Sequence, residues 1–129
     1  MEIVNYLEVW QKLERDKAAG TRIARLTGDD NCSLFAVEIA PGTVLPAHYH
    51  REGSEIYQLL AGEGEIALGN LLDGDVIWRE KMVIKRGDCL TIAPNSVHRL
   101  ANPGRTNLQL LCTAPPAHLG DDRTFVGER

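Results

Sequence analysis

The chain has 129 residues, of which 43% are hydrophobic and 25% charged, and its formal net charge is −4. This length suits one domain with its own core, and the sequence lacks an apolar run of about 18 residues that could cross a membrane. Neither a basic patch nor a secretory signal pattern is present, so we expect a cytoplasmic protein that binds neither nucleic acid nor a membrane. The three cysteines lack zinc or redox spacing and are interpreted as free thiols.

Residues 5–18 are expected to form a helix. Four hydrophobic positions recur at the spacing of one helical face, namely Tyr6, Val9, Trp10 and Leu13. Asn5 can cap the helix at its start, and Gly20 can end it. A strand within residues 2–10 is the competing interpretation. In the helical interpretation, the face that carries Trp10 packs on the outside of the strands that follow or on a partner subunit.

From residue 21 onward the pattern changes to short hydrophobic segments separated by turns. We expect strands at residues 21–27, 33–40, 56–61, 65–68, 76–78, 82–84, 90–92, 97–101 and 107–113. So many short strands in one domain are typical of a β-sandwich or a β-barrel.

The stretch from Gly42 to Gly62 holds the residues best suited to a chemical role. It reads G-TVLPA-H-Y-H-REGS-E-IYQLLA-G. Because side chains alternate along a strand, His48 and His50 project to the same face. A turn at Gly53 then lets the chain return as a second strand, which brings Glu55 back to that face. Two imidazoles and one carboxylate that converge on a point form a site for a first-row metal ion.

Two further segments carry no motif of their own. Residues 69–86 are expected to be an extended hairpin on the rim of the fold, and a lid over its mouth is the alternative. After Pro115 and Pro116, which stop the last strand, the polar tail of residues 115–129 is expected to fold back over the surface or to cross to a partner. His118, within this tail, is interpreted as a surface histidine.

A second stretch runs from Gly87 to His98, with Asn102 four residues further on. Together, the two stretches resemble the two signature motifs of the cupin superfamily, over roughly residues 34–114. The first motif is matched at every position, whereas in the second Ala93 and Asn95 replace the usual proline and glycine of the turn. Because asparagine tolerates positive φ better than most residues, we expect the turn to keep its geometry.

The resemblance implies an all-β fold, the double-stranded β-helix or jelly-roll barrel, preceded by a short N-terminal helix. The whole chain, 1–129, would be one cupin domain with its core at about 21–114. The resemblance also implies one divalent metal ion per chain, either Fe, Mn, Zn, Ni or Co, held by His48, His50, Glu55 and His98. More loosely, the Leu-Gly-Asp-Asp of the tail is similar to the tails of small cupins labelled mannose-6-phosphate isomerase-like.

Other residues are placed by strand alternation. Tyr57 shares the face of Glu55, and these two are the candidate catalytic residues. The Tyr57 hydroxyl either donates a hydrogen bond to a bound substrate or belongs to a core tyrosine, and both interpretations stay open. Leu100 should face inward, and either Gln109 or Leu110 does so on the last strand. A phosphorylated substrate would want cations near the mouth, for which the candidates are Arg51, Arg79, Lys81 and Arg99.

Three functions fit this sequence. The first is a metal-dependent enzyme that acts on a small sugar, sugar phosphate or carboxylate, with the metal as a Lewis acid. The second is an Fe(II)-dependent dioxygenase, and the third is a non-catalytic module that binds a small molecule in the barrel. We also expect a homodimer, because sheet edges and outward apolar residues such as Ile56 and Leu60, with the Trp10 helix, need cover.

Overall fold

The structure, a computed structural model, describes residues 1–13 and 20–127. In that part of the chain, ten strands form two five-stranded antiparallel sheets, accompanied by two short helices. The first sheet, in spatial order, contains β1 (Thr21–Gly28), β2 (Ser33–Ile39), β9 (Leu108–Ala114), β4 (Glu55–Ala61) and β7 (Cys89–Ile92). The second sheet contains β10 (Thr124–Phe125), β3 (Val44–Tyr49), β8 (Val97–Ala101), β5 (Glu63–Leu72) and β6 (Asp75–Lys85). The helices are α1 (Tyr6–Lys12) and the 3₁₀ helix η1 (Pro116–Leu119).

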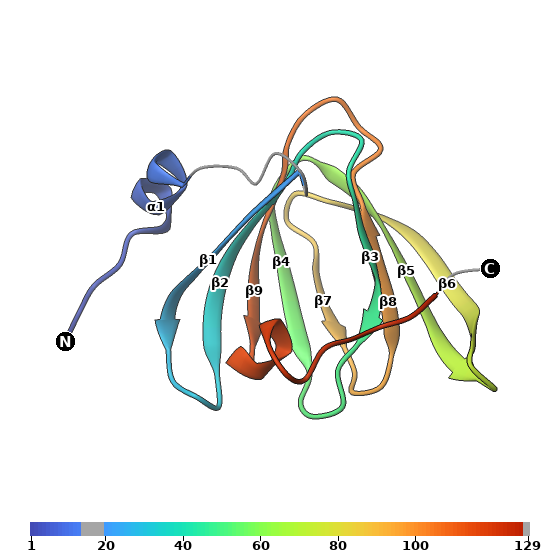
Figure 1. The fold of residues 1–129 in the computed structure, drawn as a ribbon. Coiled ribbons are helices and arrows are strands. Elements are labelled where there is room, and N and C mark those ends of the chain that lie inside the picture. The colour runs from blue at the N-terminus through green and yellow to red at the C-terminus, as the bar shows by residue number, and fades with distance from the viewer. Residues whose placement is uncertain (14–19, 128–129) are drawn as a thin grey trace.

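The two sheets face each other across one hydrophobic core, which makes the fold the double-stranded β-helix expected from the sequence. Figure 1 shows them converging at the end drawn uppermost and spreading apart at the lower end. Within the described residues, no helix is long and apolar enough to cross a membrane.

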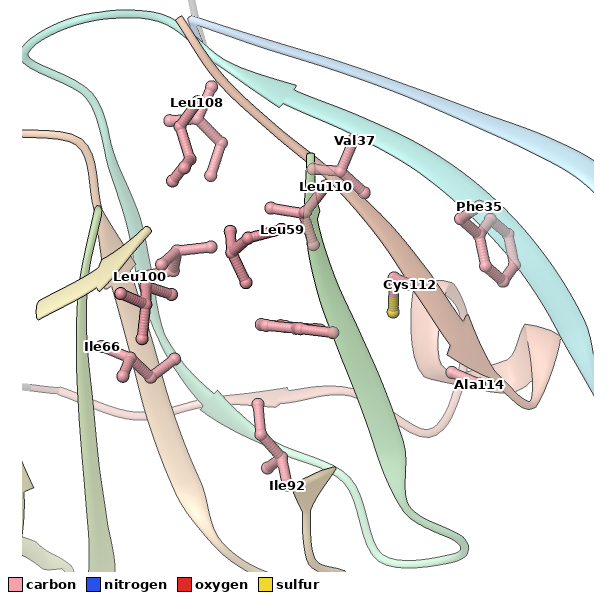
Figure 2. Close-up of a cluster of buried hydrophobic side chains, with 13 residues drawn as sticks. Phe35, Val37, Leu59, Ile66, Ile92, Leu100, Leu108, Leu110, Cys112 and Ala114 are labelled. Atoms are coloured by element: carbon pink, nitrogen blue, oxygen red, sulfur yellow. The ribbon is translucent and has the colours of Figure 1, made fainter. Parts of the chain in front are cut away.

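The core lies between the sheets because alternate side chains of each strand point inward. Leu59 and Leu110 meet Leu100 and Ile66 of the opposite sheet, as Figure 2 shows. Gln58 is exposed, so the alternation predicted for β4 is confirmed. The structure also resolves the register of β9, because Leu110 is the residue that faces inward.

Helix α1 is shorter than predicted. Asn5 caps it as expected, since its side-chain oxygen accepts hydrogen bonds from the backbone N–H groups of Leu7 (3.0 Å) and Glu8 (3.3 Å). The helix ends at Lys12, and Leu13 already has extended backbone angles, so Gly20 is not its stop. The remainder of the predicted 5–18 helix, residues 14–19, lies outside the described residues.

The helix packs on the outside of the first sheet. Trp10 is buried in a cluster with Leu26 and Ala36, and Leu60 packs against the same cluster. Arg22 anchors the end of the helix, because its guanidinium donates to the carbonyls of Trp10 (2.8 Å) and Leu13 (3.0 Å). A neighbour within the chain therefore covers much of the apolar surface that we assigned to a partner. Ile56 is still 47% exposed, and the homodimer stays a prediction.

The segment 69–86 belongs to one long hairpin of β5 and β6, which turns at Asp73 and Gly74. The short strands predicted at 76–78 and 82–84 are wrong, because β6 runs unbroken from Asp75 to Lys85. This hairpin forms the edge of the second sheet, so it is a rim hairpin and not a lid.

Candidate metal centre

The four motif side chains come together at the splayed end of the barrel. His48 lies near the end of β3 and His50 directly after it. Glu55 begins β4, and His98 lies near the start of β8, where it pairs with His48. Gly53, with φ of 75°, lets the chain turn between the two strands. The ligand atoms of the four side chains all lie within 4.8 Å of one another.

Two local irregularities help to aim these side chains. The register of β3 against β8 shifts between Leu45 and His48, and this irregularity surrounds Pro46, which has no N–H for the ladder. In the turn before β8, Asn95 has φ of 65°, so asparagine keeps the conformation that the sequence predicted for it. Its backbone N–H donates to the carbonyl of His50 (2.7 Å), which ties the two motifs together.

Backbone carbonyls fix the orientation of all three imidazoles. Nδ1 of His48 lies 2.8 Å from the carbonyl of Pro46, and Nδ1 of His98 lies 3.0 Å from that of Ser96. Nδ1 of His50 lies 2.6 Å from the carbonyl of Asp122. A carbonyl only accepts, so each Nδ1 carries the proton. In the neutral ring, Nε2 then keeps a free lone pair, which is the usual arrangement of a metal-binding histidine.

The residues present fit a metal ion. The Nε2 atoms of His50 and His98 and Oε1 of Glu55 are buried without a hydrogen-bond partner among the described residues. Both nitrogens are close to Oε1, at 2.8 Å and 3.0 Å, but a neutral ring with its proton on Nδ1 has no Nε2–H to donate to that oxygen. Buried polar atoms are costly when unpaired, so atoms that converge in this way favour a shared cation.

The electrostatic environment also suits cation binding. Burial disfavours the charged form of Glu55, but the imidazoles of His50 and His98 outweigh this and lower the pKa of that carboxyl well below its usual range. Burial, helped by the neighbouring His98, lowers the pKa of His48 to about 4. Burial opposes charge on His50 too, but the Glu55 carboxylate outweighs it and raises the pKa of His50. At neutral pH the site therefore holds a carboxylate and a neutral His48.

Two residues beside Glu55 were not predicted from the sequence. The thiol of Cys112 donates to Oε2 of Glu55 at 3.3 Å. His118 is only 1% exposed, so its interpretation as a surface histidine was wrong. Its ring stacks on that of His50, with centroids 4.0 Å apart and planes 2° from parallel. Cys112 falls on the inward face of β9 and could have been found by alternation, whereas His118 follows the last long strand and carries no periodic signal.

A cavity of about 220 Å³ opens onto this site. His48, His50 and Glu55 line it, together with Tyr57 and mostly apolar side chains. The predicted cations Arg51, Arg79, Lys81 and Arg99 do not line this cavity. Two of them have contacts away from the cavity, since Arg99 stacks over Trp78 and Lys81 pairs with Glu65 at 3.2 Å.

Arg123 is the cation that lines the cavity, and it comes from the C-terminal tail. Its guanidinium lies over the ring of Phe125, 4.9 Å from the ring centroid, and Phe125 lines the same cavity. The tail therefore folds back, as one of the two alternatives predicted, and it supplies part of the cavity wall.

Comparison with known proteins extends these observations. A family model described as a cupin domain matches residues 35–114. An uncharacterised protein of Methanocaldococcus jannaschii is 34% identical over 94 residues, which cover 73% of this chain and 68% of that protein.

Solved structures resemble the whole fold. An uncharacterised Klebsiella pneumoniae protein with a double-stranded β-helix domain has a TM-score of 0.73 at 18% identity, over 99% of both chains. A recombinant oxalate oxidase in complex with glycolate has a TM-score of 0.71 at 22% identity, over 89% of this chain and 60% of that one. At these identities the likeness concerns the fold.

Proposed function

This chain belongs to the cupin family, and from that premise we propose that it is an enzyme that binds one divalent metal ion and acts on a small carboxylate. The proposed ligands are His48, His50, Glu55 and His98. The observation that carries the proposal is the cavity, in which three of these side chains share the wall with Arg123.

The size and lining of the cavity favour a carboxylate over a sugar. A cavity of about 220 Å³ holds only a small ligand. A sugar or sugar phosphate needs a hydrogen-bonding partner for each of several hydroxyl groups, because burying an unpaired polar group is costly. The walls supply few such partners, since residues such as Leu45, Leu100 and Leu110 make up much of them. Arg123, in contrast, offers the forked donors that match a carboxylate.

The proposed ligand set leaves room for such a substrate. These four side chains would hold the ion, and a 2-hydroxy or 2-oxo acid offers a carboxylate and a neighbouring oxygen, which are donors that divalent ions accept. A bound divalent ion would act there as a Lewis acid that polarises the substrate oxygen. The protein's own groups would do the rest: Arg123 orients the carboxylate, and the apolar wall limits access of water. The oxalate oxidase of similar fold was solved with glycolate, a two-carbon carboxylate of this kind.

The test compares glycolate with acetate, which lacks the second oxygen donor. The protein is purified without chelator or nickel resin, its metal content is measured, and both ligands are titrated by calorimetry. We expect one metal ion per chain and at least about tenfold tighter binding of glycolate, a difference of roughly 1.4 kcal/mol. Equal binding of the two, or binding that survives removal of the metal, would contradict the proposal. Incorporation of both atoms of O₂ into the product would assign the dioxygenase function. Binding without turnover would assign the binding module.

A further inference from the structure

The three histidines of the site differ in what holds them. His48 and His98 each bond through Nδ1 to the carbonyl two residues earlier on their own segment, that of Pro46 and that of Ser96. His50 instead bonds to the carbonyl of Asp122, which lies 72 residues further along the chain. Two imidazoles are thus oriented locally, whereas the orientation of the third depends on the C-terminal segment.

His118 adds a second restraint on the same imidazole. Its ring lies flat against that of His50, and its Nε2 donates to the carbonyl of Glu52 at 2.5 Å. Its Nδ1 lies 3.8 Å from Oε2 of Glu55 and is buried without a hydrogen-bond partner among the described residues. His118 therefore contacts both the His50 ring and the turn that joins His50 to Glu55.

The segment that carries these groups, Pro115–Val126, is fixed to the barrel at further points. The carboxylate of Asp122 accepts from the backbone N–H groups of Arg51 (2.8 Å) and Glu52 (3.0 Å). Strand β10 pairs with β3 beside His48, and Val126 donates to the carbonyl of Ala47 at 3.0 Å. In Figure 1 this segment, drawn in red, runs from β9 in one sheet to β3 in the other, and so it bridges the two sheets at the splayed end.

We propose that Pro115–Val126 is a working part of the metal centre, in which His118 is a positioning residue for His50. Because the segment orients a ligand, its docking raises metal affinity. Coupling between two binding events is reciprocal, so the metal must stabilise the docked segment by the same amount. The inference rests on the proposed function only for the presence of the metal, and it needs no substrate.

The experiment uses Co²⁺ as the probe, because its visible absorption reports on the ligands and its affinity can be measured by competition with a chelator. The variants are His118→Ala, Asp122→Ala and, as the matched control, Asp121→Ala at the exposed neighbouring position. Loss of a group that orients a ligand typically weakens metal binding by about 10- to 100-fold. We expect that loss of Co²⁺ affinity, together with an altered Co²⁺ spectrum, in His118→Ala. The loss of affinity should be smaller in Asp122→Ala and less than about twofold in the control.

A second measurement needs no variant and so does not depend on how well the variants fold. Hydrogen exchange of amides in residues 116–126 is compared in the wild-type protein with and without Co²⁺. Slower exchange in the loaded protein supports the inference. The inference is overturned if exchange is unchanged, or if a folded His118→Ala variant keeps the affinity and the spectrum of the wild type. Either result leaves the metal site itself intact. Failure of the wild-type protein to bind Co²⁺ at all overturns both this inference and the proposed function.

Discussion

The thiol of Cys112 holds one oxygen of Glu55, so that the other faces the imidazoles. Its Sγ lies 3.3 Å from Oε2, while Oε1 lies 2.8 Å from Nε2 of His50 and 3.0 Å from Nε2 of His98. The pKa of the Cys112 thiol is raised by burial and by the Glu55 carboxylate, so the sulfur keeps the proton that it donates. Oε1 of Glu55 is thereby left facing the two Nε2 atoms, where the proposed metal ion would lie.

We therefore predict that Cys112→Val weakens metal binding by about tenfold, because Glu55 loses the donor that orients it. The thermal stability of the Cys112→Val variant should fall only slightly, since the valine side chain fills a volume similar to that of cysteine. Cys112→Ser is the matched control, because serine keeps a donor at the same position. Chelator competition measures both variants, and equal affinity of Cys112→Val and wild type would refute the role of the thiol.

Removal of the carboxylate itself should have a larger effect. We expect Glu55→Ala to lose activity on any substrate of the protein, while circular dichroism shows a folded barrel. Glu55 is the only anion among the four proposed ligands, and three neutral imidazoles bind a dication less tightly. Glu55→Gln keeps the shape of the side chain and removes its negative charge, so this variant separates the effect of charge from the effect of shape. Turnover by Glu55→Ala at the wild-type rate, under matched metal loading, would remove the metal from the mechanism.

Arg123→Ala should separate substrate binding from metal binding. A charge-assisted hydrogen bond contributes about 1.5–3 kcal/mol, so we expect glycolate affinity to fall by roughly 10- to 100-fold. Metal affinity should stay close to that of the wild type, because the guanidinium is not a ligand. Arg79→Ala, on the distant edge strand β6, is the control and should bind glycolate normally. If both variants behave alike, Arg123 does not recognise the carboxylate.

In the metal-free protein, His48 and His50 should titrate on opposite sides of the ordinary histidine value. The pKa of His48 is lowered from 6.5 to about 4, so it favours folding above pH 6.5 and this contribution is lost as the pH falls toward about 4. The pKa of His50 is raised, so its contribution is present below pH 6.5 and is lost as the pH rises through the raised value. Imidazole resonances followed by NMR through a pH titration check this order. Coincident titration of the two rings would contradict it.

Metal removal should lower the melting temperature without abolishing cooperative unfolding. The core between the sheets is built mainly from apolar side chains, none of which is a proposed metal ligand, so we expect the barrel to fold without metal. A ligand that binds only the folded state at about 100 times its Kd adds roughly 2.7 kcal/mol to the free energy of unfolding. Calorimetry with and without chelator measures the shift. Loss of the transition in chelator would show that the metal is part of the core.

The motifs predicted the fold and the cluster of four side chains because their information is local. Gly53, Asn95 and the alternation around His48 and Glu55 act within a few residues, where backbone sterics determine the outcome. Alternation also placed Leu100 and Tyr57 in the interior correctly.

His118 and Arg123 could not be predicted in this way. Their positions follow from docking of the tail on a loop and a strand edge about 70 residues earlier in the chain, and no periodic pattern records such a contact. Helix α1 was overestimated for a related reason. The apolar spacing continued past Lys12, but packing on the sheet, where Arg22 takes up the carbonyl of Leu13, determines where the helix ends.

The position of β9 has a consequence for the order in which the chain can fold. β9 is hydrogen-bonded to β2 on one side and to β4 on the other, yet it is among the last strands in the sequence. A nascent chain that has not yet reached Leu108 leaves facing edges of β2 and β4 unpaired, and open edges of this kind invite pairing with other chains. Sheet pairing over such long sequence separations is slow to form. The barrel is therefore expected to close only late in synthesis, when the strand that joins the two halves of its first sheet emerges from the ribosome.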